Sequence, residues 1–297
     1  MDRTPQQAQA LLYFDSVSTE WRRKAEGRVP KVNVIAQRNE CVHRAATAIP
    51  HLRSMLDIGC GTGELVLEMA AKGVAATGID FAPEMIRLCQ QKRRALGRRS
   101  VQFECCSVFD YEAPEASQDL TSALGFIEYI SPEELAHLLE ICRGVLRPDG
   151  VLALGSRNRI FNMVSLNEYT QMEIALGTAD RLMDEAIAFS EAGDLESALE
   201  AASVEQRLPQ PEAHPETGID VAVRYQYTPA ELAGILREMG FAPFAVYPVH
   251  YHPMPPRAKA GMPEVHTAFS NSIFETAGAD HRLIPFSSSF VIASRKQ

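Results

Sequence analysis

The sequence lacks several features that would place it in a specialised class of protein. It contains no run of about 18 apolar residues, so no transmembrane helix and no membrane partner are expected. Its first residues lack the apolar segment of a secretory signal, and a cytoplasmic location is expected. The six cysteines form no C-x-x-C pair, so we expect reduced, apolar cysteine side chains and no metal site.

Basic residues are also outnumbered. Lys and Arg total 29 against 38 Asp and Glu, which gives a net charge of −9. A protein that binds polyanions usually carries a basic face, so no nucleic-acid partner is expected. The chain is 46% hydrophobic and 23% charged, as globular proteins are, and its 297 residues can bury a full core.

Strand-like and helix-like segments alternate along much of the chain. This alternation predicts an α/β fold with a doubly wound, mostly parallel sheet of seven strands. The expected strands are 54–58, 74–79, 101–106, 120–124, 151–155, 241–250 and 290–294. The expected helices between them are 64–72, 83–96, 132–146 and 228–239.

The same patterns divide the chain into four regions. Residues 1–50 are expected to form a helical lid segment, and residues 51–156 the ligand-binding core. Residues 157–226 show no strand alternation, and we expect a helical cap insertion of two or three helices there. Residues 227–297 are expected to complete the sheet, with a long loop at 253–287.

A glycine-rich turn follows the first expected strand, in the pattern Asp-x-Gly-x-Gly-x-Gly from Asp57 to Gly63. Glycines let a backbone turn tightly and approach a ligand, and the following helix points free N–H groups at it. The Gly-Lys-Ser/Thr of a phosphate loop is absent. The third glycine falls one residue early for a G-x-G-x-x-G fingerprint, which disfavours an NAD-dependent oxidoreductase. Asp80 ends the second strand, where an acceptor suits ribose hydroxyls, although it could also cap the next helix.

These residues together resemble the class I S-adenosylmethionine-dependent methyltransferases. The resemblance covers about residues 50–156 and, more loosely, 226–252 and 288–296. It implies a Rossmann-like fold and S-adenosyl-L-methionine as the cofactor. Ser107 stands where the family often has an acid. The implied cofactor-binding residues are Asp57, Gly59, Cys60, Gly61, Gly63, Asp80, Phe81, Met85, Ser107, Val108, Gly125 and Phe126.

The resemblance and the position of the cap imply O-methylation of a small molecule in a biosynthetic pathway. An oxygen acceptor usually needs its proton removed, and the candidate residues are His250, His252, Glu128 and Tyr129. Strand alternation places the two histidines on one face, where a structural role is the alternative. Such a pair can also chelate a metal, but no carboxylate lies close in sequence, so no metal is expected.

The acceptor side of the site is expected to carry aromatic and cationic side chains. Guanidinium groups there would suit a carboxylate or phosphate on the acceptor, although a solvated or helix-capping arginine is the alternative. The expected substrate-binding residues are Tyr13, Trp21, Arg157, Arg159, Arg224 and Tyr227.

Two other functions fit the same cofactor site. One is N- or C-methylation of a small molecule, which needs no strong base. The other is a methyltransferase-like subunit that binds the cofactor without chemistry. In each case the expected ligand partner is a small molecule, and a homo-oligomer is compatible with the sequence.

Overall fold

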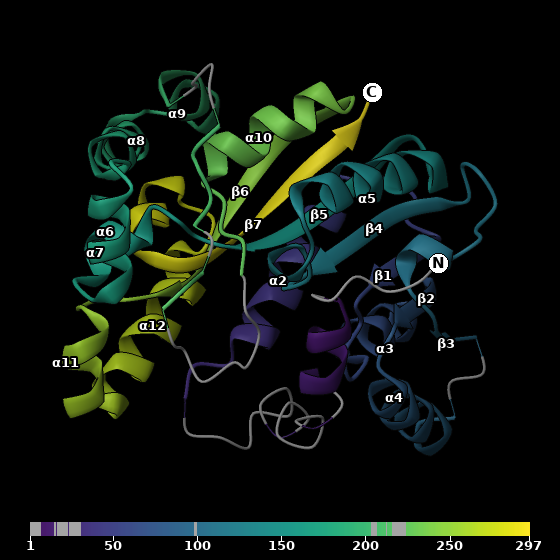
Figure 1. Ribbon diagram of the computed structural model, residues 1–297. Helices are drawn as coiled ribbons and strands as arrows, with labels where there is room; N and C mark the ends of the chain where they lie inside the picture. Colours follow the sequence, from purple (N-terminus) through teal and green to yellow (C-terminus); the bar gives the residue numbers. More distant parts are fainter. Residues whose placement is uncertain are drawn as a thin grey trace.

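Seven strands form one twisted sheet in the computed structural model (Figure 1), which describes residues 7–14, 16, 23, 31–97, 100–202, 207–211, 213–215 and 224–297. The strand order is β3-β2-β1-β4-β5-β7-β6. The strands are β1 (Ser54–Ile58), β2 (Ala75–Asp80), β3 (Gln102–Cys105), β4 (Gln118–Leu124), β5 (Leu146–Arg157), β6 (Phe241–Tyr251) and β7 (Ser287–Lys296). Strand β7 runs antiparallel to β5 and β6, and the remaining pairs are parallel. The predicted α/β fold is therefore confirmed.

The chain reverses its direction of strand addition at β1. Strands β2 and β3 lie on one side of β1, whereas β4 and β5 lie on the other. Ile58, the last residue of β1, pairs with Ile79 of β2 and Ala123 of β4. In open α/β sheets the loops after such strands diverge and leave a crevice at the carboxyl ends, where ligands bind.

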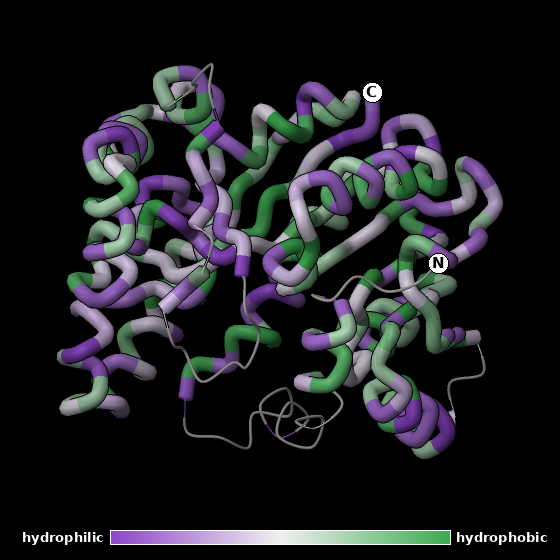
Figure 2. Tube along the Cα trace, viewed as in Figure 1, coloured by the Kyte–Doolittle hydropathy of each residue, from purple (hydrophilic) through white to green (hydrophobic). Residues whose placement is uncertain are grey.

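Helices cover both faces of the sheet. Strand residues alternate between the faces: Met55 packs in one hydrophobic cluster and Leu56 in the other. The first face is covered by α2 (Val34–Ala46), α3 (Glu64–Ala71), α4 (Pro83–Ala95) and α12 (Pro263–Ala277). The second face is covered by α5 (Pro132–Val145) and α10 (Pro229–Glu238). Figure 2 shows hydrophobic residues concentrated along the central strands, with mixed colouring on the outer helices.

Local sequence signals fix where several helices begin. Ser131 and Glu134 form the predicted capping box of α5: the Ser131 hydroxyl accepts from the Glu134 N–H, and the Glu134 carboxylate accepts from the Ser131 N–H. Thr228 accepts from the Glu231 N–H and caps α10. Such caps are each worth about 1 kcal/mol, so they set helix boundaries rather than the fold.

Two regions differ from the expectation. Residues 157–226 contain four described helices instead of two or three: α6 (Phe161–Ser165), α7 (Glu168–Ala175), α8 (Ala179–Glu191) and α9 (Leu195–Ala201). Helix α8 ends at Glu191, and Asp194 caps the next helix by accepting from the Ser197 N–H. The expected loop at 253–287 contains α11 (Pro256–Gly261), α12 and the short helix η3 (His281–Phe286). Proline begins both α11 and α12, where its missing N–H costs nothing.

The N-terminal region is divided between the sheet and the cavity. Helix α2 packs against β6, β7 and β5, so this part of the expected lid belongs to the layered core. Residues 7–14 are helical and place Ala10 and Phe14 against Tyr129. Trp21 lies outside the described residues. None of the described helices is long and apolar enough to cross a membrane.

A buried ion pair ties α7 to the end of β5. Arg159 is 1% exposed, and its Nε and Nη2 donate to the Glu173 carboxylate at 2.9–3.2 Å. Asn162 and Thr178 donate to the same carboxylate. The other bond of Nη2 goes to the Pro209 carbonyl oxygen at 2.9 Å. This network holds the cap in place, because each buried charge has a partner.

We predict that Glu173→Ala destabilises the protein by about 3–5 kcal/mol, because it leaves the Arg159 charge buried and unpaired. Urea unfolding followed by circular dichroism measures the effect. The matched control is Glu238→Ala, whose partner Arg207 is 58% exposed, and which should cost at most ~1 kcal/mol. Equal losses in the two variants would contradict the role given to the buried pair.

Candidate functional site

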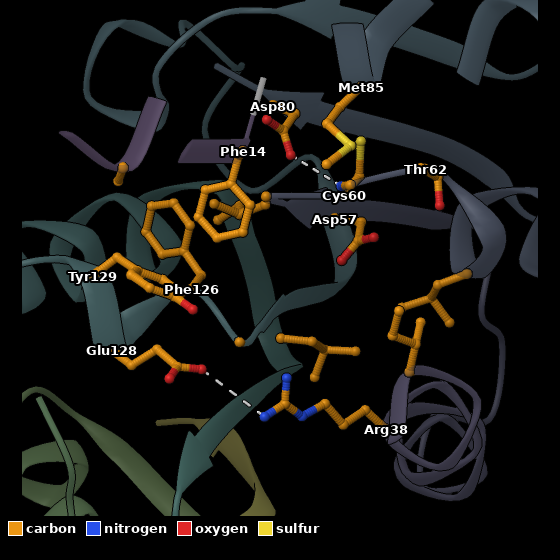
Figure 3. Close-up of a pocket in the computed structure, with 18 of the residues that line it drawn as sticks. Phe14, Arg38, Asp57, Cys60, Thr62, Asp80, Met85, Phe126, Glu128 and Tyr129 are labelled. Atoms are coloured by element: carbon orange, nitrogen blue, oxygen red, sulfur yellow. Dashed lines mark hydrogen bonds and ion pairs between the residues drawn. The ribbon is translucent and has the colours of Figure 1, made fainter. Parts of the chain in front are cut away.

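A cavity of about 520 Å³ opens at the carboxyl ends of the strands. The turn after β1 and the ends of β2 and β4 line one part of it, and residues from β5, β6, β7 and α2 line the other. Phe14 of the N-terminal helix lies over the cavity, close to Phe126 and Tyr129 (Figure 3). The cavity therefore occupies the crevice that the strand order predicts.

The three glycines of the turn have different tasks, although all have positive φ, at 65° for Gly59, 54° for Gly61 and 79° for Gly63. A Cβ at Gly61 would meet no atom within 4 Å, because this residue borders the cavity. A Cβ at Gly63 would lie 2.8 Å from the Phe103 ring and 2.9 Å from the Cys89 sulfur. Gly61 therefore leaves room for a ligand, whereas Gly63 lets α3 pack closely and does not line the cavity.

Asp80 joins the end of β2 to the glycine turn. Its carboxylate accepts from the Gly61 N–H at 3.0 Å and from the Ala82 N–H at 2.9 Å. It is 8% exposed and lines the cavity. Burial raises the pKa of Asp80 to about 6, although both N–H groups oppose the rise. The sequence left two roles open for Asp80, namely ligand binding and capping of the next helix. The side chain lines the cavity and also accepts from the N–H just before α4.

Asp57 is the second carboxylate at this end of the cavity. Its Oδ1 accepts from the Ser122 hydroxyl at 2.6 Å, and the side chain is almost fully buried. Burial raises the pKa of Asp57 to about 7, against the effect of the Ser122 bond. A ligand that brings positive charge or hydroxyl donors to these two groups would favour their ionised forms.

Most of the predicted cofactor residues lie together. Besides Asp57, Gly59, Gly61 and Asp80, the predicted residues that line the cavity are Cys60, Phe81, Met85, Ser107, Val108, Gly125 and Phe126. The Ser107 hydroxyl accepts from the Phe109 N–H at 3.3 Å and caps the short helix η1 (Val108–Asp110). The sequence pattern thus locates this end of the cavity residue by residue.

At the other end of the cavity, three arginines gather around one glutamate. Glu128 is 3% exposed, hydrogen-bonds Arg224, and lies 4.0 Å from Arg38 (Figure 3). Burial alone would raise the pKa of Glu128, but Arg224, Arg38 and Arg157 together hold it below its usual value. One ionised carboxylate thus faces three guanidinium groups.

Arg157 contributes the least neutralised of these charges. Its Nε is buried without a hydrogen-bond partner among the described residues, and its guanidinium lies 5.5 Å from the centre of the Tyr169 ring. Burial, followed by repulsion from Arg224, lowers the pKa of Arg157. An anionic group entering the cavity would find complementary charge and free donors here.

The four predicted proton acceptors are placed differently. Glu128 is ionised but held by arginines, and burial raises the pKa of Tyr129 well above its usual value. His250 lines the cavity, and its Nδ1 lies 3.1 Å from the Ser288 hydroxyl. His252 lies behind His250, with the ring centres 4.2 Å apart, and does not line the cavity.

Only some of the residues predicted to bind the methyl acceptor line the cavity. Arg157 and Arg224 line the cavity. Arg159 does not, because its guanidinium is bound to Glu173 as described above, and Tyr227, which is 2% exposed, does not line the cavity either. Tyr13 packs edge-on against Phe14, which takes the lining position.

Several lining residues were missed in the sequence because no local motif marks them. They are Phe14, Lys31, Arg38, Ser288 and Ser289. Arg38 reaches the site from α2, where its guanidinium donates to the Ser289 hydroxyl at 2.9 Å. A basic residue in an amphipathic helix gives no signal of that contact.

Comparisons with known proteins agree with this geometry. Residues 55–150 match the sequence profile of a family described as methyltransferase domain. A ubiquinone biosynthesis O-methyltransferase of Xanthomonas campestris is 34% identical over 116 residues, which are 39% of this chain and 47% of that protein. One from Paracidovorax citrulli is 31% identical over 109 residues, or 36% and 44% of the two chains. The chain thus spans about half the length of the curated relatives it matches.

Solved structures share the fold across nearly the whole chain. Magnesium protoporphyrin IX methyltransferase from Synechocystis, with bound S-adenosylhomocysteine, superposes with a TM-score of 0.57 at 15% identity, covering 98% of this chain and 100% of that one. The 1,6-didemethyltoxoflavin-N1-methyltransferase from Burkholderia thailandensis gives 0.55 at 18% identity, covering 100% and 92%.

The glycine turn and Asp80 both lie within the matched segment. Residues 55–150 therefore match the methyltransferase-domain family, and the chain has the fold of solved S-adenosylmethionine-dependent methyltransferases.

Proposed function

We propose that this protein transfers the methyl group of S-adenosylmethionine to a small-molecule acceptor that carries an anionic group. The observation that carries the proposal is the charge distribution of the cavity. Asp57 and Asp80 lie at one end, and three arginines with one glutamate lie at the other. A cationic cofactor and an anionic acceptor would each find complementary charge, and would meet between the two ends.

The cofactor is expected to lie along the glycine turn. Its ammonium and sulfonium groups suit the carboxylate end, and its ribose hydroxyls can donate to Asp80. Gly61 leaves space for the close approach of the methionyl part. Phe81 and Met85 line the same part of the cavity and offer apolar contacts to the adenine.

The reaction is an in-line displacement at the methyl carbon. The acceptor's lone pair forms the new bond as the bond from carbon to sulfur breaks, and the sulfonium becomes a neutral thioether. The protein's contribution is to hold the acceptor atom in line and to exclude water. Phe14, Phe126 and Tyr129 are aromatic residues that line the middle of the cavity and would form this dry wall.

For the acceptor atom we propose oxygen, with His250 as the side chain that contacts it. The support is the name of the curated relatives, which are O-methyltransferases, together with the position of His250 on the cavity wall. A nitrogen acceptor is the second candidate. It is favoured by the pKa directions of Glu128 and Tyr129, which make both side chains poor proton acceptors at neutral pH, since a neutral amine attacks without prior loss of a proton.

We predict that S-adenosylhomocysteine stabilises the protein against heat and that NAD does not. A ligand at about 100 times its Kd adds roughly 2.7 kcal/mol, which moves the unfolding midpoint by several degrees. Differential scanning fluorimetry measures the shift. A shift with NAD alone, or with neither ligand, would refute the cofactor assignment.

A pair of glycine variants tests where that ligand binds. Gly61 and Gly73 both have positive φ and open space where a Cβ would lie, but only Gly61 lines the cavity. Gly61→Ala and Gly73→Ala should therefore lose similar stability, about 1–2 kcal/mol. Only Gly61→Ala should lose S-adenosylhomocysteine binding in isothermal titration calorimetry. Equal affinities in the two variants would place the ligand elsewhere.

We predict that the affinity for S-adenosylhomocysteine rises as the pH increases from about 5 to 8. The pKa of Asp80 is raised to about 6 and that of Asp57 to about 7, so both carboxyls lose their protons in this interval. The ionised forms attract the ligand's ammonium and accept from its hydroxyls, so affinity falls as the pH drops through these values. Titration calorimetry across the interval tests this, and Asp80→Asn should remove the part of the dependence near pH 6 and leave the part that Asp57 causes near pH 7. A pH-independent Kd in the unmodified protein would contradict it.

We predict that Arg157→Gln raises the KM for a carboxylate-bearing acceptor about tenfold to a hundredfold, because a charged hydrogen bond is lost. Transfer of labelled methyl groups to pairs of acceptors, each an acid and its amide, provides the measurement. The control is Arg207→Gln, an exposed arginine outside the cavity that should leave KM unchanged. Equal use of the acid and the amide by the unmodified protein would contradict the anionic acceptor.

A further inference from the structure

Three histidines from two separate segments form a cluster behind the acceptor end of the cavity. His250 is the penultimate residue of β6, His252 is the first residue after this strand, and His266 lies on α12. The ring centres are 4.2 Å apart for His250 and His252, 4.8 Å for His252 and His266, and 5.3 Å for His250 and His266. The cluster joins the end of the sheet to the helical segment that the sequence did not predict.

The nitrogen atoms of the cluster converge. The Nε2 atoms of His250 and His266 are 3.1 Å apart, and one nitrogen from each of the three rings lies within 4.8 Å of the others. Zinc takes imidazole nitrogens at about 2.0–2.1 Å, so two ligands in tetrahedral geometry lie roughly 3.3 Å apart. The first pair already has this spacing, and the His252 nitrogen, within 4.8 Å of the others, would move closer when an ion binds.

The described part of the chain leaves much of the cluster without hydrogen bonds. His252 is 6% exposed, and neither its Nδ1 nor its Nε2 has a partner among the described residues. His266 is 1% exposed, and its Nδ1 also has no hydrogen-bond partner among the described residues. Buried polar atoms are almost always hydrogen-bonded, so three unpartnered nitrogens in one place point to a missing ligand.

We propose that His250, His252 and His266 together bind one divalent transition-metal ion of the zinc type. Imidazole is a preferred ligand of zinc and its neighbours, and three histidines leave a coordination position open. The Ser288 hydroxyl, 3.1 Å from Nδ1 of His250, can fix that ring so that Nε2 faces the ion.

The backbone and the charges around the cluster bear on the proposal. His250 has a φ of +58°, which a residue with a side chain rarely adopts, and its N–H donates to the Gln37 side chain at 2.9 Å. Such strain persists where a functional geometry requires it. Lys259 and Arg38 are the cations that act on these rings, and burial and these charges lower the histidine pKa values. The rings are therefore in the neutral form that binds metals, although Lys259 would repel the ion.

Of the three histidines only His250 lines the cavity, so an ion bound by its Nε2 would lie behind the cavity wall. Such an ion would fix the orientation of the His250 ring at the acceptor end of the cavity. The binding of the metal does not rest on the proposed methyl transfer.

The test is metal binding by the full chain, purified with a tag that contains no histidine and stripped with a chelator. Titration with Zn²⁺ in a calorimeter should give one equivalent per chain, and Co²⁺ should produce a visible d–d absorption. His252→Ala should weaken binding more than about 100-fold. His51→Ala removes an exposed histidine outside the cluster and should bind like the unmodified protein.

Circular dichroism checks that each variant folds, and His266→Gln replaces His252→Ala if the latter does not. Lys259→Gln should bind the metal more tightly, because it removes a neighbouring cation. The proposal is overturned if the folded, stripped protein takes up neither Zn²⁺ nor Co²⁺. It is also overturned if a folded cluster variant binds as well as His51→Ala. Since methyl transfer is not the readout, failure here would leave the proposed function untouched.

Discussion

The hydrogen bond from the Gly61 N–H to the Asp80 carboxylate joins the ends of two neighbouring parallel strands, and the cavity depends on it. The turn after β1 is left-handed at three glycines, so its path is not that of a regular element. Asp80 fixes this turn from the adjacent strand, and its second oxygen accepts from Ala82 at the start of α4. One carboxylate thus sets the direction of the turn, the start of a helix and the wall of the cavity.

Keeping the buried Asp80 side chain ionised costs free energy. Burial raises the pKa of Asp80 and of Asp57, so the empty cavity stabilises their charged forms poorly. A ligand that supplies positive charge and hydroxyl donors would relieve this cost, as the proposed cofactor would. At the far end the imbalance has the opposite sign, because Arg38, Arg157 and Arg224 share one glutamate. Under the proposed function, the cofactor would lie at the carboxylate end of the cavity and an anionic acceptor at the arginine end.

Features set by residues that are close together in the sequence could be predicted from it. The sheet follows from the alternation of apolar segments, α5 begins at its capping box, and the glycine turn marks the cofactor end. The expectation of a loop at 253–287 was wrong, because this region holds two helices and a proline begins each of them.

Contacts between distant segments were not predictable. Arg157 and Arg159 lie two residues apart after the same strand, yet one lines the cavity and the other is buried against Glu173. His266 approaches His250 only because α12 packs on β6. The absence of a nearby carboxylate in the sequence therefore said little about metal binding, since the third candidate ligand comes from a separate helix.

The most direct test of the central claim is a crystal structure of the protein with S-adenosylhomocysteine. The account predicts electron density along the glycine turn, with the ribose hydroxyls on Asp80, the amino group near Asp57 and the sulfur directed toward the arginine end. Density for the ligand elsewhere, or a ribose that does not contact Asp80, would contradict the account.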